Sequence, residues 1–175
     1  ARLHSGDPSL YSAVAEQCRR LTERGIDYEI VPGVPAFAAA AAALGRELTV
    51  PGVAQTVTLT RVSTLSTAMP DGEDLTVLAG PGATLVIHLA AHRIDAIVPQ
   101  LLAGGYTGDT PVAVVAFASW PEQVVLRGTL TDIAAQMHAA DVTRTAVIIV
   151  GDVLAAEGFP DSYLYSAGRT RGSRH

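Results

Sequence analysis

Two residue types are missing from this sequence of 175 residues. All 12 basic residues are arginine, because the chain contains no lysine, and it contains no asparagine either. Without lysine there is no primary amine for a Schiff base, a pyridoxal-phosphate anchor or a phosphate-binding loop. Without asparagine there is no N-glycosylation acceptor and no kinase catalytic-loop asparagine. The composition therefore excludes the enzyme classes that depend on these groups.

Cysteine is nearly absent as well, since Cys18 is the single example. One thiol cannot form an intrachain disulfide, a thiolate zinc cluster or an iron–sulfur ligand set, so the usual signs of an oxidising compartment are missing. We therefore expect a cytoplasmic protein. Cys18 also falls on the apolar stripe of an expected helix, which predicts a packed and unreactive thiol.

Long apolar runs and concentrated positive charge are also missing. The longest uncharged stretches, residues 30–45 and 75–91, contain proline and glycine and fall short of the roughly 20 apolar residues of a membrane helix. The net charge is −5 and the aromatic residues are scattered, so neither a membrane nor a nucleic acid is an expected partner. None of the five histidines belongs to a metal-ligand motif; we expect no metal site and interpret His88 and His92 as structural. Hydrolase and dinucleotide-binding motifs are lacking, and the sequence nominates no catalytic residue.

What is present suits a packed α/β protein, because 49% of the residues are apolar and only 17% are charged. Helical spacing, alanine runs and β-branched runs predict the elements. The order mixes crossover and hairpin connections, which indicates a mixed sheet. Helices are expected over residues 9–24, 37–44, 91–103 and 131–140, and strands over residues 27–31, 56–61, 75–79, 84–89, 111–117, 124–128 and 146–150.

Four loops are rich in glycine, proline and small residues: residues 5–8, residues 31–35, the end of the strand 84–89, and residues 118–121. Loops of this kind at strand ends are where open α/β sheets bind ligands, although ordinary turns have the same composition. Within the first loop, Asp7 is expected to cap the following helix, or else to order a ligand-binding loop.

Six sequence blocks together extend over nearly the whole chain. They are Ser-Gly-Asp-Pro-Ser-Leu-Tyr at residues 5–11, Glu-Ile-Val-Pro-Gly-Val-Pro at 29–35, Thr-Leu-Thr-Arg at 58–61, Thr-Leu-Val-Ile-His-Leu at 84–89, Gly-Tyr followed by Thr-Pro-Val-Ala within 105–113, and Trp-Pro-Glu-Gln at 120–123. In this order, the six blocks resemble the tetrapyrrole (corrin and porphyrin) methylase family.

The resemblance implies two α/β domains with S-adenosylmethionine in the cleft between them, a tetrapyrrole substrate and a homodimer. We divide the chain into a part of the first domain at residues 1–50, a second domain with a mixed sheet at residues 51–167, and a flexible tail at residues 168–175. By position, the family's cofactor contacts would fall on Ser5, Gly6, Asp7, Leu10, Pro35, Ala36, Leu89 and Ala118. Small residues at several of these positions would let a ligand approach the backbone closely.

One family feature has no counterpart here, namely a first strand followed by a Gly-Pro-Gly-Asp loop. The chain starts at Ala1 without an initiator methionine, so the resemblance implies a first domain that is truncated at its N-terminus. We therefore expect the chain by itself to bind S-adenosylmethionine weakly and to have little methyltransferase activity.

A tetrapyrrole with many carboxylates needs arginine side chains in an acidic protein. Arg61, at the end of the strand 56–61, is the leading candidate, with an exposed or internally paired arginine as the alternative. Two other functional interpretations stay open. One is a methylase of the same family with a different target, such as another tetrapyrrole or rRNA ribose, and the other is a non-catalytic ligand-binding or dimerisation module.

Overall fold

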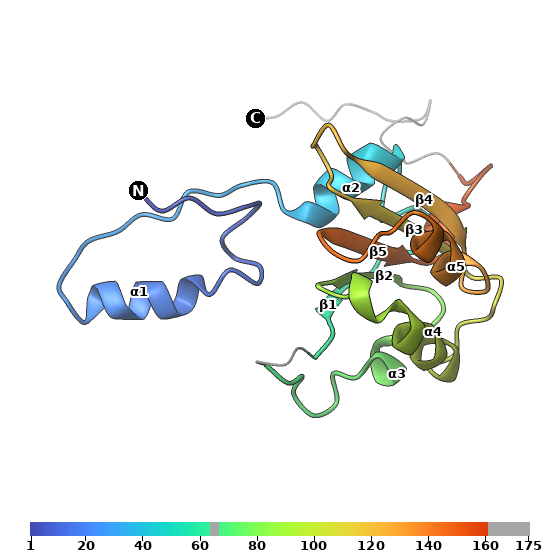
Figure 1. The fold of residues 1–175 in the computed structure, drawn as a ribbon, viewed down its shortest axis with the longest axis horizontal. Coiled ribbons are helices and arrows are strands. Elements are labelled where there is room, and N and C mark those ends of the chain that lie inside the picture. The colour runs from blue at the N-terminus through green and yellow to red at the C-terminus, as the bar shows by residue number, and fades with distance from the viewer. Residues whose placement is uncertain (64–66, 161–175) are drawn as a thin grey trace, which may run out of the picture.

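A mixed five-stranded sheet forms the centre of the protein (Figure 1), which is described by a computed structural model over residues 1–63 and 67–160. The strands are β1 (Val57–Arg61), β2 (Thr84–His88), β3 (Pro111–Ala116), β4 (Val124–Thr129) and β5 (Ala146–Val150). Their order across the sheet is β1-β2-β5-β3-β4. The β1–β2 pair is parallel and the other three pairs are antiparallel, which confirms the predicted α/β class with a mixed sheet.

Apolar β-branched side chains explain the position of the central strands. All five residues of β2 and all five of β5 are buried, as expected for strands covered on both faces. The parallel β1–β2 connection passes through the short helix α3 (Leu75–Leu78), whereas β3 and β4 are antiparallel neighbours that follow each other in the chain. One consequence matters for function: the carboxyl ends of β1, β2 and β3 lie at the same edge of the sheet.

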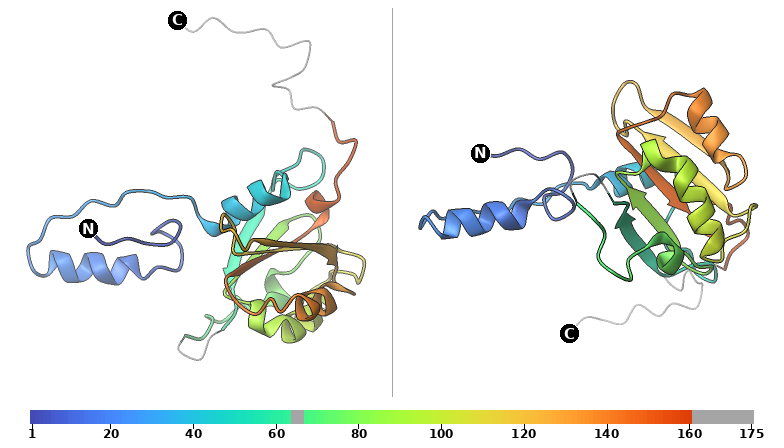
Figure 2. Two further views of the ribbon diagram at one scale, coloured as in Figure 1. Left: turned by 45° about the horizontal axis from the view of Figure 1, so that its top comes forward. Right: turned by 60° about the horizontal axis from the view of Figure 1, so that its bottom comes forward.

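Helices cover both faces of the sheet (Figure 2). One face packs against α3, α4 (Ile94–Ala103), which follows the 3-10 turn Ala91–Arg93, and α5 (Ile133–Ala139). The other face packs against α2 (Ala36–Leu44), where Ala40 is fully buried. Alanine favours the helix and lets its backbone lie close to the strands. A second 3-10 turn, Asp152–Leu154, follows β5.

Residues 1–34 form an arm that stands apart from the sheet (Figure 1). None of these residues is buried, including those of its helix α1 (Val14–Thr22). The predicted helix over residues 9–24 is wrong in its first five residues, since α1 begins at Val14. Tyr11 and Ala13 have positive φ angles of 55° and 54°, which are incompatible with an earlier helical turn. Cys18 is only half-buried, so the expected burial of its thiol is wrong too.

Two predicted strands are wrong as well. Residues 27–31 have no regular structure, because no strand of the described chain lies beside them to complete a ladder. Residues 75–79 were expected to form a strand, but the amides of Val77 and Leu78 both donate to the carbonyl of Asp74 and begin α3. Burial of Leu75 and Ala79, one helical turn apart, holds this helix against α4.

The division of the chain at residue 50 stays a prediction. Residues 36–48 share a core with the sheet, in which Leu44 and Leu48 contact the same cluster as Val86 and Ile149. The expected flexible tail at residues 168–175 lies outside the described residues.

Candidate functional site

A cavity of about 350 Å³ lies where the arm meets the sheet, at the carboxyl end of β2. This volume is within the range of small-molecule sites, about 300–1,000 Å³. Six of the eight residues predicted from the family resemblance as cofactor contacts line it together. The complete lining is Arg2, Leu3, His4, Ser5, Asp7, Leu10, Tyr11, Ser12, Pro35, Ala36, His88 and Leu89.

Asp7 holds two segments of the cavity wall together. Its Oδ1 accepts a hydrogen bond from the Ser9 amide and its Oδ2 accepts one from the Gly33 amide, both at 2.8 Å. The hydrogen bonds from Ser9 and Gly33 lower the pKa of the Asp7 carboxyl, so the ionised form is favoured. Of the two roles considered for Asp7, the structure shows the ordering of the loop rather than the capping of a helix.

Glycine is required where these two segments meet. A Cβ on Gly33 would lie 2.2 Å from the carbonyl oxygen of Gly6, which is too close for any other residue. Gly6 has a φ of +83°, and its own Cβ would lie 3.3 Å from the Val34 carbonyl oxygen. Gly6 therefore lies just behind the wall formed by Pro35 and Ala36, where it sets the separation of the two loops.

His88, at the end of β2, lines the cavity although the sequence did not indicate a role for it there. His88 is only 8% exposed, and no described residue gives its Nε2 a hydrogen-bond partner. Burial lowers the pKa of His88 and favours the neutral imidazole. Such an unpaired buried nitrogen costs the fold about 1–3 kcal/mol. His88 was interpreted as structural; its position at the end of an apolar strand, next to a family motif, is the signal that could have marked it.

Aromatic rings enclose His88. The Tyr11 ring lies 5.3 Å from it, and the Phe37 ring lies edge-on at 6.3 Å, both measured between ring centroids. Burial raises the pKa of Tyr11, and the positive charge of Arg61 opposes that rise. The negative charge of Glu73 adds to the rise. Tyr11 was also missed from sequence.

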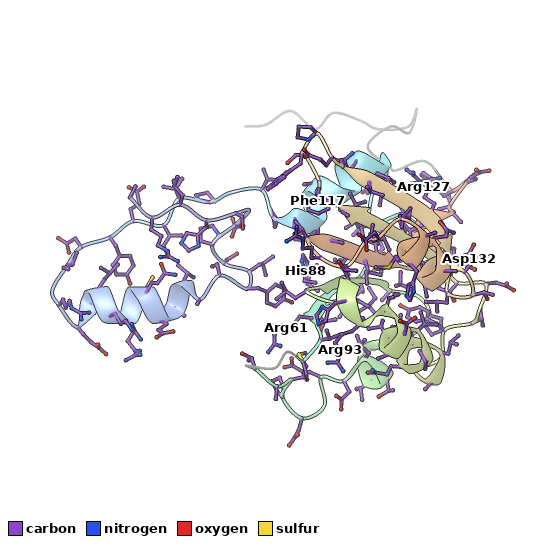
Figure 3. All side chains as sticks on the ribbon, in the orientation of Figure 1. Arg61, His88, Arg93, Phe117, Arg127 and Asp132 are labelled. Carbon is purple, nitrogen blue, oxygen red and sulfur yellow. The ribbon has the colours of Figure 1, made fainter. Side chains whose placement is uncertain are left out.

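Arg61 belongs to a neighbouring cavity of about 240 Å³, which Arg93 also lines. Figure 3 shows both arginines near the end of β2 that carries His88, and Arg61 is the register partner of His88. The Arg61 guanidinium donates to the carbonyls of Thr67 and Ala68 at 3.2 and 3.1 Å, and Arg93 donates to the carbonyl of Ser63 at 2.7 Å. Backbone carbonyls therefore hold both guanidinium groups, and the carboxylates of Glu73 and Asp74 line the same cavity.

Ala118, like Gly6, is a predicted contact that lies outside the cavity lining. It packs against the core on the α2 side of the sheet, in the loop after β3. This loop starts at the same sheet edge as Leu89, but β5 separates the two strands. Phe117 and Ser119 on either side of Ala118 have positive φ values of 52° and 68°, which turn the chain sharply there.

Two kinds of feature are absent from the described part of the chain, namely a metal-binding cluster and a membrane-spanning helix. Among residues 1–63 and 67–160, no three His, Cys, Asp or Glu side chains are grouped so that they could hold a metal ion. In the same residues, no helix combines the length and the apolarity needed to cross a membrane.

Comparisons with known proteins agree with this geometry. The family model described as Tetrapyrrole (Corrin/Porphyrin) Methylases matches residues 1–134. A protein of Mycobacterium tuberculosis named precorrin-4 C(11)-methyltransferase is 78% identical over 169 residues, which are 97% of this chain and 67% of that protein. The chain thus spans about two thirds of the length of this relative.

Solved structures give the same assignment. An X-ray structure of a cobalt precorrin-4 methyltransferase matches with a TM-score of 0.83 and 38% identity, over 87% of this chain and 64% of that one. A uroporphyrin-III C-methyl transferase from Thermus thermophilus, complexed with S-adenosyl homocysteine, matches with a TM-score of 0.71 and 27% identity, over 86% and 64%. By sequence and by fold, the chain belongs to the tetrapyrrole (corrin/porphyrin) methylase family.

Proposed function

We propose that the protein transfers a methyl group from S-adenosylmethionine to carbon 11 of precorrin-4, a step of cobalamin biosynthesis. The single observation that carries this proposal is the shared cavity: six of the residues that the family resemblance assigns to the cofactor line it together, namely Ser5, Asp7, Leu10, Pro35, Ala36 and Leu89. The 78% identity to a precorrin-4 C(11)-methyltransferase supports the choice of substrate.

The cavity suits the two halves of S-adenosylmethionine. Pro35, Ala36 and Leu89 offer small or apolar side chains together with backbone groups, the usual surroundings of a nucleoside. Asp7 adds a carboxylate beside the loop, which would attract the ammonium group of the methionine tail. S-adenosylmethionine, when bound, supplies an electrophilic methyl group on a sulfonium, so the protein's own residues have only to bind and orient the reactants.

Arg61 and Arg93 would hold carboxylates of the tetrapyrrole. Both line the cavity beside the cofactor site, and their guanidinium groups contact neutral carbonyls. Alignment of two bound reactants can lower a barrier by about 7–11 kcal/mol, which accounts for a methyl transfer without a covalent intermediate on the enzyme. Methyl transfer to carbon 11 would break the carbon–sulfur bond with S-adenosylhomocysteine as the leaving group, and loss of a proton from the methylated ring would balance the charge.

A mass-spectrometric assay tests this function. The whole protein is incubated with S-adenosylmethionine and, separately, with precorrin-4, cobalt-precorrin-4, uroporphyrinogen III and other precorrins. We expect a gain of one methyl group on precorrin-4. A gain on cobalt-precorrin-4 alone would transfer the assignment to the substrate of the 38% identical solved relative. No gain on any of them would favour the non-catalytic module.

A homodimer in the cytoplasm completes the proposal. The family resemblance implies the dimer, and the arm carries exposed apolar side chains such as Leu3, Ile30 and Val31, which are typical of interaction surfaces. Light scattering on the whole protein tests the dimer, because a monomer mass at micromolar concentration contradicts it.

A further inference from the structure

His88 is a buried polar side chain to which the proposed function assigns no task. Its Nε2 lacks a hydrogen-bond partner within the described chain, and the residue lines the cavity between Tyr11 and Leu89. Buried polar atoms are nearly always paired in folded proteins, so an unpaired one in a cavity wall indicates a partner that arrives with a ligand.

Two aromatic rings pack against the His88 ring. Phe37 belongs to α2, which is packed on the sheet, and its ring meets His88 edge-on. Tyr11 belongs to the arm, none of whose residues is buried, and its ring lies over His88 at 5.3 Å. Segments with few buried contacts open at low cost, so Tyr11 is the ring that can withdraw.

The chemistry of the nitrogen selects one part of the ligand. A neutral imidazole suits neutral hydrogen-bonding groups, whereas carboxylates are better matched by the charged guanidinium groups of Arg61 and Arg93. The nucleoside of S-adenosylmethionine carries neutral ribose hydroxyls and an adenine amino group. We propose that the Nε2 of His88 hydrogen-bonds the nucleoside of S-adenosylmethionine after the Tyr11 ring moves aside. This inference rests on the proposed function and adds to it a specific binding residue.

Nuclear magnetic resonance on the whole protein tests the contact without any change of sequence. With 15N-labelled histidine, the His88 Nε2 resonance is identified by its absence from the His88→Phe variant. We expect S-adenosylhomocysteine and adenosine to shift this resonance, and methionine or uroporphyrin III alone to leave it unchanged. If calorimetry shows that S-adenosylhomocysteine binds while the resonance stays in place, the inference is wrong. A shift with uroporphyrin III alone would contradict it too, since His88 would then contact the substrate.

Two variants separate hydrogen bonding from packing. His88→Phe keeps an aromatic ring against Tyr11 and Phe37 but removes Nε2, whereas His88→Gln keeps a polar group near that position. We expect the Kd for S-adenosylhomocysteine to rise about tenfold in the Phe variant and to stay within about threefold in the Gln variant. Equal affinities of the wild type and the Phe variant would reduce His88 to a packing residue.

The failure of this inference can be told apart from that of the proposed function. If the wild-type protein binds S-adenosylhomocysteine and methylates precorrin-4 but its His88 Nε2 resonance does not shift, the inference alone is overturned. A wild-type protein that binds S-adenosylhomocysteine through His88 but methylates no tetrapyrrole overturns the proposed reaction alone. A wild-type protein that does not bind S-adenosylhomocysteine overturns both.

Discussion

The sheet and the arm differ in how much of their side-chain surface is buried. In the sheet, β2 and β5 are buried along their whole length and helices cover both faces. In the arm, residues 1–34 contain no buried side chain, and the loop geometry depends on polar contacts such as that between Asp7 and Gly33. The candidate cofactor cavity takes one wall from each. Rigid strand ends thus supply fixed positions, and the arm supplies the part that can adjust to a ligand.

The largest expected effect contrasts a core residue with an arm residue. Ile149→Ala removes a fully buried side chain from β5 and should lower the free energy of unfolding by about 2–5 kcal/mol. Val31→Ala truncates a side chain that is 69% exposed. This substitution should change the free energy of unfolding by less than about 0.5 kcal/mol. Urea denaturation measures both. Equal losses would mean that the arm belongs to the same cooperative core as the sheet.

The second prediction concerns the carboxylate that orders the arm. Asp7→Ala leaves the amides of Ser9 and Gly33 without their acceptor, so the cavity wall loses its geometry. We expect the Kd for S-adenosylhomocysteine to rise about tenfold or more with little change in melting temperature. Glu16→Ala, in the exposed ion pair of α1 with Arg20, is the matched control and should bind normally. Normal binding by the Asp7 variant would show that the loop keeps its shape unaided.

The third prediction concerns Arg61 in the proposed substrate site. Arg61→Ala should raise the KM for precorrin-4 about five- to tenfold while leaving the Kd for S-adenosylhomocysteine unchanged, because Arg61 lines the neighbouring cavity. Arg61→Lys should recover part of the loss, since it restores the charge without the planar fork. Arg20→Ala, in the arm, serves as the control. An unchanged KM would remove Arg61 from the substrate site.

The smallest expected effect is a pH dependence of stability. Burial lowers the pKa of His88 in the folded state, so below pH 6.5 the unfolded chain binds a proton more readily than the folded one. Stability due to neutral His88 is therefore complete above pH 6.5 and decreases as the pH falls toward the lowered folded-state value. We expect a decrease of about 2 °C in melting temperature from this group between pH 7.5 and 5.5. The His88→Phe variant should lack that component. Identical pH profiles would mean that His88 is protonated as easily in the fold as outside it.

Sequence patterns located most of the sheet because β2, β3 and β5 are short, mostly apolar segments with clear ends. Residues 146–150 were predicted correctly, and the alanine run of α2 and Gly45 after it mark that helix correctly as well. Residues 75–79 were misread because a short segment of four apolar residues and one threonine fits a strand and a helical turn equally. The contact of Leu75 and Ala79 with α4 decides between them, and that contact is tertiary.

The candidate site was predictable only in its loops. Motif positions pointed to Ser5, Asp7, Pro35 and Leu89, and the structure gathers these around one cavity. The pairing of Tyr11 with His88 joins residues 77 positions apart through a loop with a positive φ angle, which no local pattern encodes. Whether the gathered residues bind the cofactor stays a prediction.

The hydrogen bond from the Gly33 amide to the Asp7 carboxylate joins two residues that are 26 positions apart in sequence, at the base of the arm. The part of the arm around α1 projects away from the sheet (Figure 1), and nothing lies within 4 Å of a Cβ added at Gly25, in the turn after that helix. Exposed turns of this kind accept inserted domains. A fluorescent protein inserted at Gly25 would be attached to the arm, whose base forms part of the cavity wall. A movement of the arm on cofactor binding would therefore change its fluorescence, while the strands of the sheet stay unmodified.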